Sequence, residues 1–248
     1  MRRFVVTGLD LGQDLLEVRG DLFRHLATVL RLKIDTHITL TDGHGVECTG
    51  IIRSIGRESL TMALAERRSS RLCDSGPRIT LYQGLPKGDK MELILQKCTE
   101  LGIAEVVPFA AERSVTRIPA DREVERVRRW RRIVEEAARQ ANRITVPTVR
   151  LAGTMAEAVR EGKHSLKLLL WEDEQGMILK CALAGHPNPD GIAVIVGPEG
   201  GITPGEAALA RSSGFIPASL GNRILRTETA GIAITAILQY HYGGLGDG

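Results

Sequence analysis

The chain has 248 residues, of which 43% are hydrophobic, 25% are charged and only 4% are aromatic. This length allows one large or two modest domains, and the composition is ordinary for a soluble globular protein. So few aromatic side chains argue against a platform that stacks several bases. The chain start develops no apolar signal-peptide stretch, and the apolar run at residues 192–196 is too short to cross a bilayer. We therefore expect no membrane association.

The four cysteines lie far apart in the sequence, at Cys48, Cys73, Cys98 and Cys181. No pair has the spacing of metal ligands or of a redox motif. Reduced thiols in a cytoplasmic protein are therefore the expected state.

The formal net charge of +3 is unevenly distributed along the chain. Residues 113–143 contain ten arginines against five acidic residues, so this stretch is strongly basic. A compact basic zone on a nearly neutral protein suggests a polyanionic partner. A solvated helix face would explain the charge alone equally well, so this feature by itself leaves both interpretations open.

Residues 1 to about 70 are predicted to form a small, strand-rich unit. Short β-branched or alternating runs predict strands at residues 3–6, 36–41, 46–52 and 59–64. A helix is expected at residues 21–32, where one face carries Leu22, Leu26, Val29 and Leu30. Residues 66–77 are polar and contain serine, glycine and proline, so they are interpreted as a linker.

From Arg78 onward, predicted strands alternate with predicted helices, which is typical of an α/β domain with a mainly parallel sheet. A helix capped by Asp89 should end at Gly102. The other helices are expected at residues 121–142, 177–183, 203–211 and 227–242. The strands are expected at residues 79–82, 106–109, 166–171, 192–196 and 215–220. Residues 192–196 are continuously apolar, as in a strand buried on both faces.

The loop Gly197-Pro198-Glu199-Gly200-Gly201 joins that buried strand to a helix with strong capping signals at Thr203, Pro204 and Glu206. Ligands of doubly wound sheets bind at this end of the strands, and glycines let a ligand approach the backbone. The loop has neither a P-loop nor a dinucleotide-binding pattern, and Glu199 would repel phosphate. A cationic or neutral ligand fits better, and S-adenosylmethionine carries a sulfonium and an ammonium. The alternative is a tight turn without a ligand.

A second loop, LGNRILRTETA at residues 220–230, also joins a strand to a helix, for which Thr227 is the expected cap. The helix is apolar on nearly all sides, so it should be buried in the core or against another subunit. Arg226 and Glu228 are charged groups beside this helix and need partners. They either form an ion pair that fixes the loop or contact a ligand or substrate.

Together the two loops resemble the SPOUT superfamily of knotted methyltransferases. Within it, nearly the whole chain is similar to the 16S ribosomal RNA uridine-N3 methyltransferases, the small-subunit methyltransferase E family. Three further segments are similar to motifs of that family, namely HLATVLR at 25–31, KCTELG at 97–102 and EAARQANR at 136–143. No motif of the family is missing.

The resemblance implies an α/β fold in two domains. Residues 1–70 would form a PUA-like β-barrel that helps bind RNA. Residues 71–248 would form the SPOUT methyltransferase domain, with a parallel sheet, a C-terminal trefoil knot and a cofactor site near the interface of a homodimer. A knotted chain would be an exception to the rule that folds avoid knots.

The implied activity is methyl transfer from S-adenosylmethionine to N3 of one uridine in the decoding region of 16S ribosomal RNA, within the small ribosomal subunit. One alternative is a related methyltransferase that acts on another RNA, such as transfer RNA. A second is an RNA-binding factor without catalytic activity. A dinucleotide-dependent oxidoreductase on an α/β sheet is disfavoured because the glycine fingerprint is missing.

The resemblance also implies where the cofactor binds. The expected residues are Leu170, Trp171, Glu172, Gly197, Pro198, Glu199, Gly200, Gly201, Leu220, Gly221, Ile224, Leu225, Arg226, Thr227 and Thr229. Because neutral uracil N3 is a poor nucleophile, the enzyme must remove its proton or stabilise the resulting anion. Arg226 could stabilise charge on the uracil oxygens, and Glu228 or Glu199 could accept the proton. Methyl transfer from a sulfonium needs no metal, and none is expected.

RNA contacts are expected on both domains. In the long basic helix, four arginines at helical spacing share a face, and Val124, Val127, Val134 and Ala138 should dock the opposite side. With the family resemblance, phosphate binding is favoured over a solvated face. The expected RNA-binding residues are His25, Arg31, Lys33, Arg122, Arg126, Arg129, Arg132 and Arg143.

Overall fold

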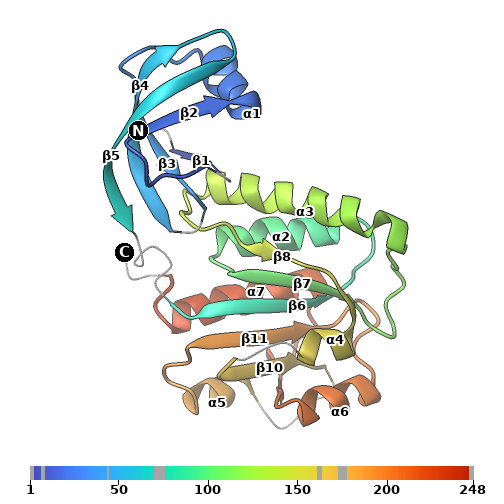
Figure 1. The fold of residues 1–248 in the computed structure, drawn as a ribbon. Coiled ribbons are helices and arrows are strands. Elements are labelled where there is room, and N and C mark those ends of the chain that lie inside the picture. The colour runs from blue at the N-terminus through green and yellow to red at the C-terminus, as the bar shows by residue number, and fades with distance from the viewer. Residues whose placement is uncertain are drawn as a thin grey trace. The chain divides into compact units, whose positions relative to one another are not determined.

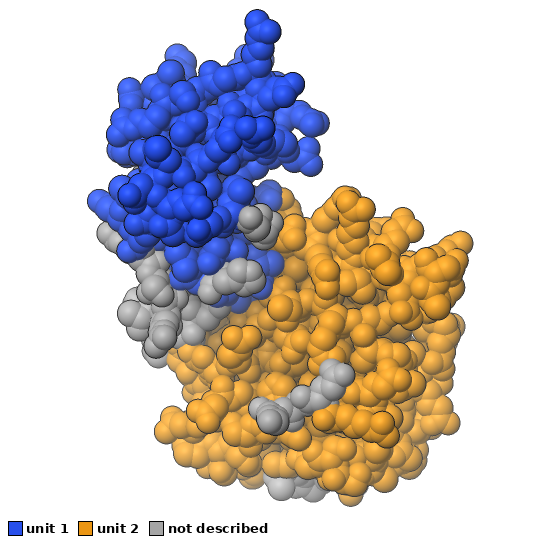
Figure 2. All heavy atoms as spheres, in the orientation of Figure 1, with its two compact units in different colours: residues 1–74, 138–146 blue, residues 75–137, 147–248 orange. Residues whose placement is uncertain are grey.

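The computed structural model describes residues 3–6, 9–43, 45–69, 76–160, 164–172 and 178–245. The chain divides into two compact units, residues 1–74 with 138–146, and residues 75–137 with 147–248 (Figure 2). Residues 138–146 join the first unit through hydrogen bonds. The Thr41 hydroxyl donates to the Ile144 carbonyl at 3.0 Å, and the Val146 amide donates to the Gly43 carbonyl at 3.0 Å.

The first unit is built on a five-stranded, mostly antiparallel sheet with the order β1-β3-β4-β5-β2, in which only the β1–β3 pair is parallel (Figure 1). Its core consists of side chains such as Leu26, Ile38, Leu40 and Met62. The elements are β1 Arg3–Val5, β2 Leu15–Arg19, α1 Gly20–Phe23, the π-helix η1 Arg24–Val29, β3 His37–Thr41, β4 Val46–Ile55 and β5 Ser59–Ser69.

Three expectations for this unit were wrong in detail. Strand β2 was not predicted, and the expected helix at 21–32 is a single α-turn followed by a π-helix, which leaves Val29 66% exposed. The expected linker begins too early, because β5 continues to Ser69. Backbone pairing with β4 does not depend on side-chain polarity, so polar residues extend the strand past a bulge in which Glu66 has φ 48°. The rest of the expected linker up to residue 75 lies outside the described residues.

The second unit contains a parallel seven-stranded sheet with the order β12-β10-β11-β6-β7-β8, and β9 pairs with β7 (Figure 1). The strands are β6 Arg78–Gly84, β7 Glu105–Ala110, β8 Thr148–Val149, β9 Ala152–Thr154, β10 Leu166–Leu170, β11 Gly191–Val196 and β12 Ile216–Ala218. The helices are α2 Lys90–Glu100, α3 Ala120–Gln140, α4 Met155–Arg160, α5 Leu179–Ala184, α6 Pro204–Ser212 and α7 Thr227–His241.

The order of strands and helices confirms the predicted α/β architecture. All six residues of β11 are buried, as its continuous apolar sequence predicts. Side chains of α4 and α6 pack on one face of the sheet, while α7 contacts β6, β11 and α2. The elements β8, β9 and α4 were not predicted, because two to six residues are too few to show a hydrophobic period. The trefoil knot stays a prediction.

Helix capping follows the sequence at α6 and departs from it at α2 and α7. The Thr203 hydroxyl accepts from the Glu206 amide while the Glu206 carboxylate accepts from the Thr203 amide, so the predicted capping box is confirmed. Asp89 precedes α2 without a side-chain cap, and Thr227 is the first residue inside α7 rather than its cap. Both predictions of a cap were wrong, and the Thr227 hydroxyl is used elsewhere.

Cys48 and Cys98 are buried free thiols, Cys181 is an exposed one, and Cys73 lies outside the described residues. Burial raises the pKa of Cys98 to about 12. In the part of the chain that the structure describes, no helix is long and apolar enough to cross a membrane.

Candidate functional site

A cavity of about 620 Å³ lies where β10, β11 and β12 end, at the carboxyl edge of the parallel sheet. Its walls come from residues 170–172, 196–202 and 218–230, so the strand end and both loops that the sequence indicates meet here. Every residue predicted to bind the cofactor lines this cavity except Gly200 and Thr229. The lining also includes residues that are not among the predicted cofactor contacts, namely Lys90, Ile178, Val196, Ile202, Ala218, Ser219, Asn222, Arg223 and Ala230.

Gly200 packs against Arg113 and does not line the cavity. A Cβ atom at Gly200 would lie 2.8 Å from both Cβ and the carbonyl oxygen of Arg113. Arg113 Nη1 also donates to the Gly200 carbonyl at 3.3 Å. The glycine is therefore required for close approach to the chain after β7. Its neighbour Gly201 lines the cavity with φ 73°, a backbone conformation that favours glycine.

The buried hydroxyl of Thr227 connects three separate segments. It donates to the carbonyl of Gly197 at 2.6 Å and accepts from Gln83 Nε2 at 2.8 Å. The glycine loop, the end of β6 and the start of α7 are thereby held at one point. Gln83 is fully buried, and it lies just beyond the strand predicted at residues 79–82, so the sequence did not indicate it.

A lysine and two glutamates cluster at one side of the cavity. Lys90 Nζ lies 2.8 Å from Glu199 Oε1 and 3.5 Å from Glu228 Oε2. The backbone amide of Lys87 donates to both Glu199 oxygens, at 3.1 and 3.3 Å. Burial alone would raise the pKa of Glu199, but hydrogen bonds from Lys90 and from backbone amides hold it below its ordinary value. The hydrogen bond with Glu199 raises the pKa of Lys90.

The two glutamates differ in how much of their hydrogen-bonding capacity is used. Glu199 accepts from two donors and is ionised. The side chain of Glu228 is 13% exposed, and its Oε2 accepts no hydrogen bond from the described residues, with Lys90 at 3.5 Å as its charge partner. Arg226 is exposed, lines the cavity and forms no ion pair within the described ranges. Hydrogen bonds therefore occupy the Glu199 carboxylate, whereas Glu228 Oε2 can still accept one. The Arg226 guanidinium has no ion-pair partner among the described residues.

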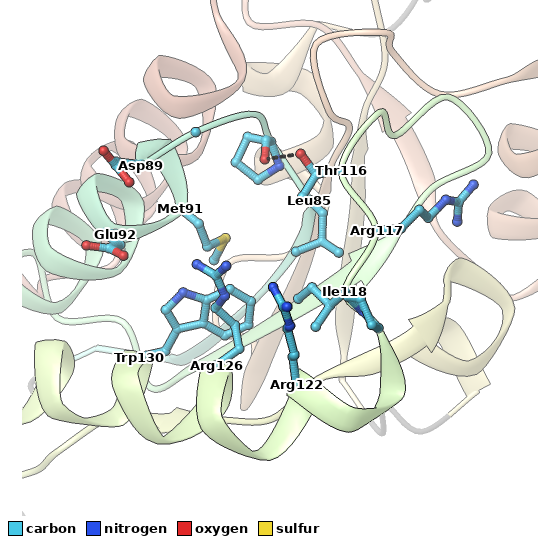
Figure 3. A pocket seen from close by; sticks show the side chains of 13 residues that line it. Leu85, Asp89, Met91, Glu92, Thr116, Arg117, Ile118, Arg122, Arg126 and Trp130 are labelled. Atoms are coloured by element: carbon cyan, nitrogen blue, oxygen red, sulfur yellow. Dashed lines mark hydrogen bonds between the residues drawn. The ribbon is translucent and has the colours of Figure 1, made fainter.

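The arginines expected to bind RNA from α3 do not form one uniform face. Arg122 and Arg126 line a second cavity (Figure 3). Arg129 forms an ion pair with Glu92 at 2.6 Å, and Arg132 is exposed. The predicted docking face was wrong at Val124, which is 81% exposed. Val134 and Ala138 are buried as predicted, and Trp130, which was not among the predicted docking residues, is buried as well.

The remaining predicted RNA contacts lie in the first unit. Arg31 and Lys33 are exposed, and half-buried His25 packs edge-on against Phe4 with ring centroids 6.2 Å apart. Arg143 is only 8% exposed, and its Nη2 donates to the Thr145 hydroxyl at 3.1 Å. This burial argues against a phosphate contact by Arg143.

Comparison with known proteins identifies the family. The family model described as RNA methyltransferase domain matches residues 74–239, and the model described as RNA methyltransferase PUA domain matches residues 18–63. The ribosomal RNA small subunit methyltransferase E of Mycobacterium bovis is 32% identical over 228 residues, which cover 89% of this chain and 84% of the relative.

Solved structures agree with these matches. The ribosomal RNA small subunit methyltransferase E of Neisseria gonorrhoeae, bound to S-adenosyl methionine, is 33% identical with a TM-score of 0.82, and 98% of each chain is covered. A structure from Legionella pneumophila in complex with the cofactor SAM is 32% identical with a TM-score of 0.82 over 96% of each chain. The resemblance that the sequence motifs predict is thus confirmed, and the chain belongs to the ribosomal RNA small subunit methyltransferase E family of RNA methyltransferases.

Proposed function

We propose that this protein transfers a methyl group from S-adenosylmethionine to N3 of one uridine in the decoding region of 16S ribosomal RNA, within the small ribosomal subunit. Membership of the family supports an S-adenosylmethionine-dependent ribosomal RNA methyltransferase. The observation that carries the proposal is the cavity at the sheet edge, where both loops of the family meet. The similar protein from Neisseria gonorrhoeae was solved bound to S-adenosyl methionine.

The residues of this cavity fit the chemistry of the cofactor. Its volume lies within the range of small-molecule sites, roughly 300–1,000 Å³. Apolar side chains such as Val196, Ile202 and Leu220 suit an adenine ring, while the carboxylates of Glu172 and Glu199 suit positively charged groups. When bound, S-adenosylmethionine supplies a methyl group that is activated by its sulfonium.

The protein's own residues must deal with the proton on uracil N3. We assign its removal to Glu228, because Glu199 already accepts hydrogen bonds from Lys87 and Lys90. The proton moves from N3 to a carboxylate oxygen of Glu228 as the N–methyl bond forms. Lys90 lies 3.5 Å from this carboxylate as its charge partner, and Arg226 stabilises negative charge on the uracil oxygens.

The proposed domains are residues 1–70 as a PUA-like unit that helps bind RNA and residues 71–248 as the catalytic domain. We further infer a homodimer that buries part of α7, and a cytoplasmic location in which the small subunit is accessible. Exposed Arg31, Lys33, Arg122, Arg126 and Arg132 are the candidate contacts to the RNA backbone.

Mass spectrometry of 16S ribosomal RNA tests the reaction directly. RNA from a strain lacking this gene should have lost one methyluridine, and the purified protein with S-adenosylmethionine should restore it. Restoration of a methyl group in transfer RNA instead would reassign the substrate. RNA binding without any methyl transfer would contradict enzymatic function.

Calorimetry with S-adenosylmethionine tests the cofactor site. Ala230→Leu adds bulk to the cavity wall on a helix that tolerates leucine, so we expect affinity at least about tenfold weaker. Ala208→Leu is the matched control, because Ala208 is exposed on α6 and does not line the cavity. Equal affinities for S-adenosylmethionine in the two variants would show that the cofactor does not bind in this cavity.

A further inference from the structure

A second cavity, of about 440 Å³, lies between the first turn of α2, residues 116–119 and the N-terminal half of α3 (Figure 3). Asp89 and Met91 line it, whereas Lys90 between them lines the cavity assigned to the cofactor. The first turn of α2 therefore contributes to both cavities. Nothing in the proposed reaction uses this second space.

Two guanidinium groups reach this cavity without a compensating ion pair. Arg122 and Arg126 lie one turn apart on α3 and extend toward the space, while Arg117 points away from it (Figure 3). Neither Arg122 nor Arg126 forms an ion pair with a described residue, whereas Arg129, the next arginine on this side, is neutralised by Glu92. Like charges one turn apart repel each other, so an anion between them would be favoured.

Trp130 supplies an independent indication of a ligand. Its side chain is only 2% exposed, and its Nε1–H has no hydrogen-bond partner among the described residues. Buried indole donors usually find an acceptor, either in the protein or in a bound group. Leu85, Met91 and Ile118 form the apolar part of the same wall. The cavity thus combines an apolar wall, an unused donor and two arginines without an ion-pair partner among the described residues, and the carboxylates of Asp89 and Glu92 also line it.

We propose that this cavity receives one nucleotide of the RNA substrate other than the methylated uridine. Its phosphate binds Arg122 and Arg126, and a carbonyl oxygen or ring nitrogen of its base accepts from Trp130 Nε1–H. The cavity volume suits a ligand of this size. Because both arginines are exposed, the RNA chain can continue outside the cavity on either side. The inference rests on the proposed function, since the ligand is part of the same RNA.

A matched pair of arginine variants tests the phosphate contact. Arg126→Ala and Arg128→Ala each remove one exposed arginine from α3, but only Arg126 lines the cavity. In filter binding to a 16S fragment with the decoding region, we expect the Kd to rise about tenfold for Arg126→Ala and less than twofold for Arg128→Ala. The slope of log Kd against log salt should fall by about one only for Arg126→Ala. Equal effects in the two variants would overturn the inference.

Trp130→Phe tests the base contact, because it keeps an aromatic ring and removes the donor. We expect affinity for the intact fragment to fall about 3- to 10-fold, as for one lost hydrogen bond. A series of fragments with a single abasic nucleotide should then contain one position at which wild type and Trp130→Phe bind equally. The same loss at every abasic position would refute a base in this cavity.

Two measurements distinguish a failure of this inference from a failure of the proposed function. Cofactor affinity by calorimetry should be unchanged in Arg126→Ala and Trp130→Phe, and sedimentation should give the same oligomeric state as the wild type. A change of oligomeric state with unchanged RNA affinity would assign the cavity to contact between copies of the chain and overturn the proposal. Failure of the wild type to bind or methylate the fragment would instead overturn the proposed function.

Discussion

At the scale of single residues, the site depends on contacts between groups far apart in the sequence. Lys90 stands more than one hundred positions before both glutamates that it contacts, and Gln83 also stands more than one hundred positions before Thr227. Neither Lys90 nor Gln83 belongs to a pattern that indicates a function. The difference between Glu199 and Glu228 follows from these contacts, because hydrogen bonds occupy one carboxylate and leave the other available.

Glu228→Gln tests the assignment of the proton acceptor. The amide keeps the shape of the side chain but cannot take the proton, so kcat for methyl transfer should fall about 100-fold or more. Affinity for S-adenosylmethionine should change little, because the role assigned to Glu228 is toward uracil N3 and not toward the cofactor. Single-turnover transfer of a labelled methyl group measures the rate. A kcat within about threefold of the wild type would show that another group accepts the proton.

Glu199 should make stability depend on pH. Its pKa is lowered in the folded protein, so the Lys90–Glu199 pair contributes stability above the ordinary value of 4.5 and loses it as the pH falls through the lowered pKa. Each side chain is about one third exposed, so solvent screening should keep the contribution small. Urea unfolding of wild type and Glu199→Gln should show a difference at pH 7 that shrinks below pH 4.5. A difference that grows on acidification would contradict this sign.

At the scale of secondary-structure elements, the starts of the helices show where the local sequence no longer predicts how a capping side chain is used. The capping box of α6 forms between Thr203 and Glu206, which stand three positions apart, although both side chains also hydrogen-bond to Glu112. The start of α7 is different, because the Thr227 hydroxyl bonds to Gly197 and Gln83 on other segments. A threonine before an apolar helix is compatible with either role. Tertiary contacts decide between them.

Thr227→Val should destabilise the second unit. Valine has the same shape but leaves the buried Gln83 amide without this acceptor, so the free energy of unfolding should fall by about 1–3 kcal/mol. Thr229→Val is the control, since Thr229 is exposed two residues later in α7 and should change stability by less than about 0.5 kcal/mol. Urea unfolding compares the two variants. Equal stabilities would mean that the three segments are not held together by this hydroxyl.

At the scale of the whole molecule, exposed apolar side chains on two contacting helices form the surface that we propose for a homodimer interface. Leu93 on α2 is 42% exposed, and Ile237 and Tyr240 on α7 are 41% and 75% exposed. Ile237→Asp should therefore convert a dimer into a monomer at micromolar concentration, as measured by sedimentation. Val124→Asp is the control, because Val124 is 81% exposed on α3 and should leave the dimer intact. A wild-type monomer that binds the cofactor fully would refute the dimer.

The sequence by itself determined the α/β class, the buried strand β11 and the positions of both loops that line the large cavity. These features depend on hydrophobic period, on glycine and on capping residues, which act over a few consecutive positions. Only the tertiary structure decided that Lys90 joins the two glutamates, that Arg129 is paired while Arg122 and Arg126 are available, and that Trp130 has a buried donor without a partner. The reason is physical: ion pairing and burial depend on distances between side chains of different elements, and a local pattern does not contain those distances.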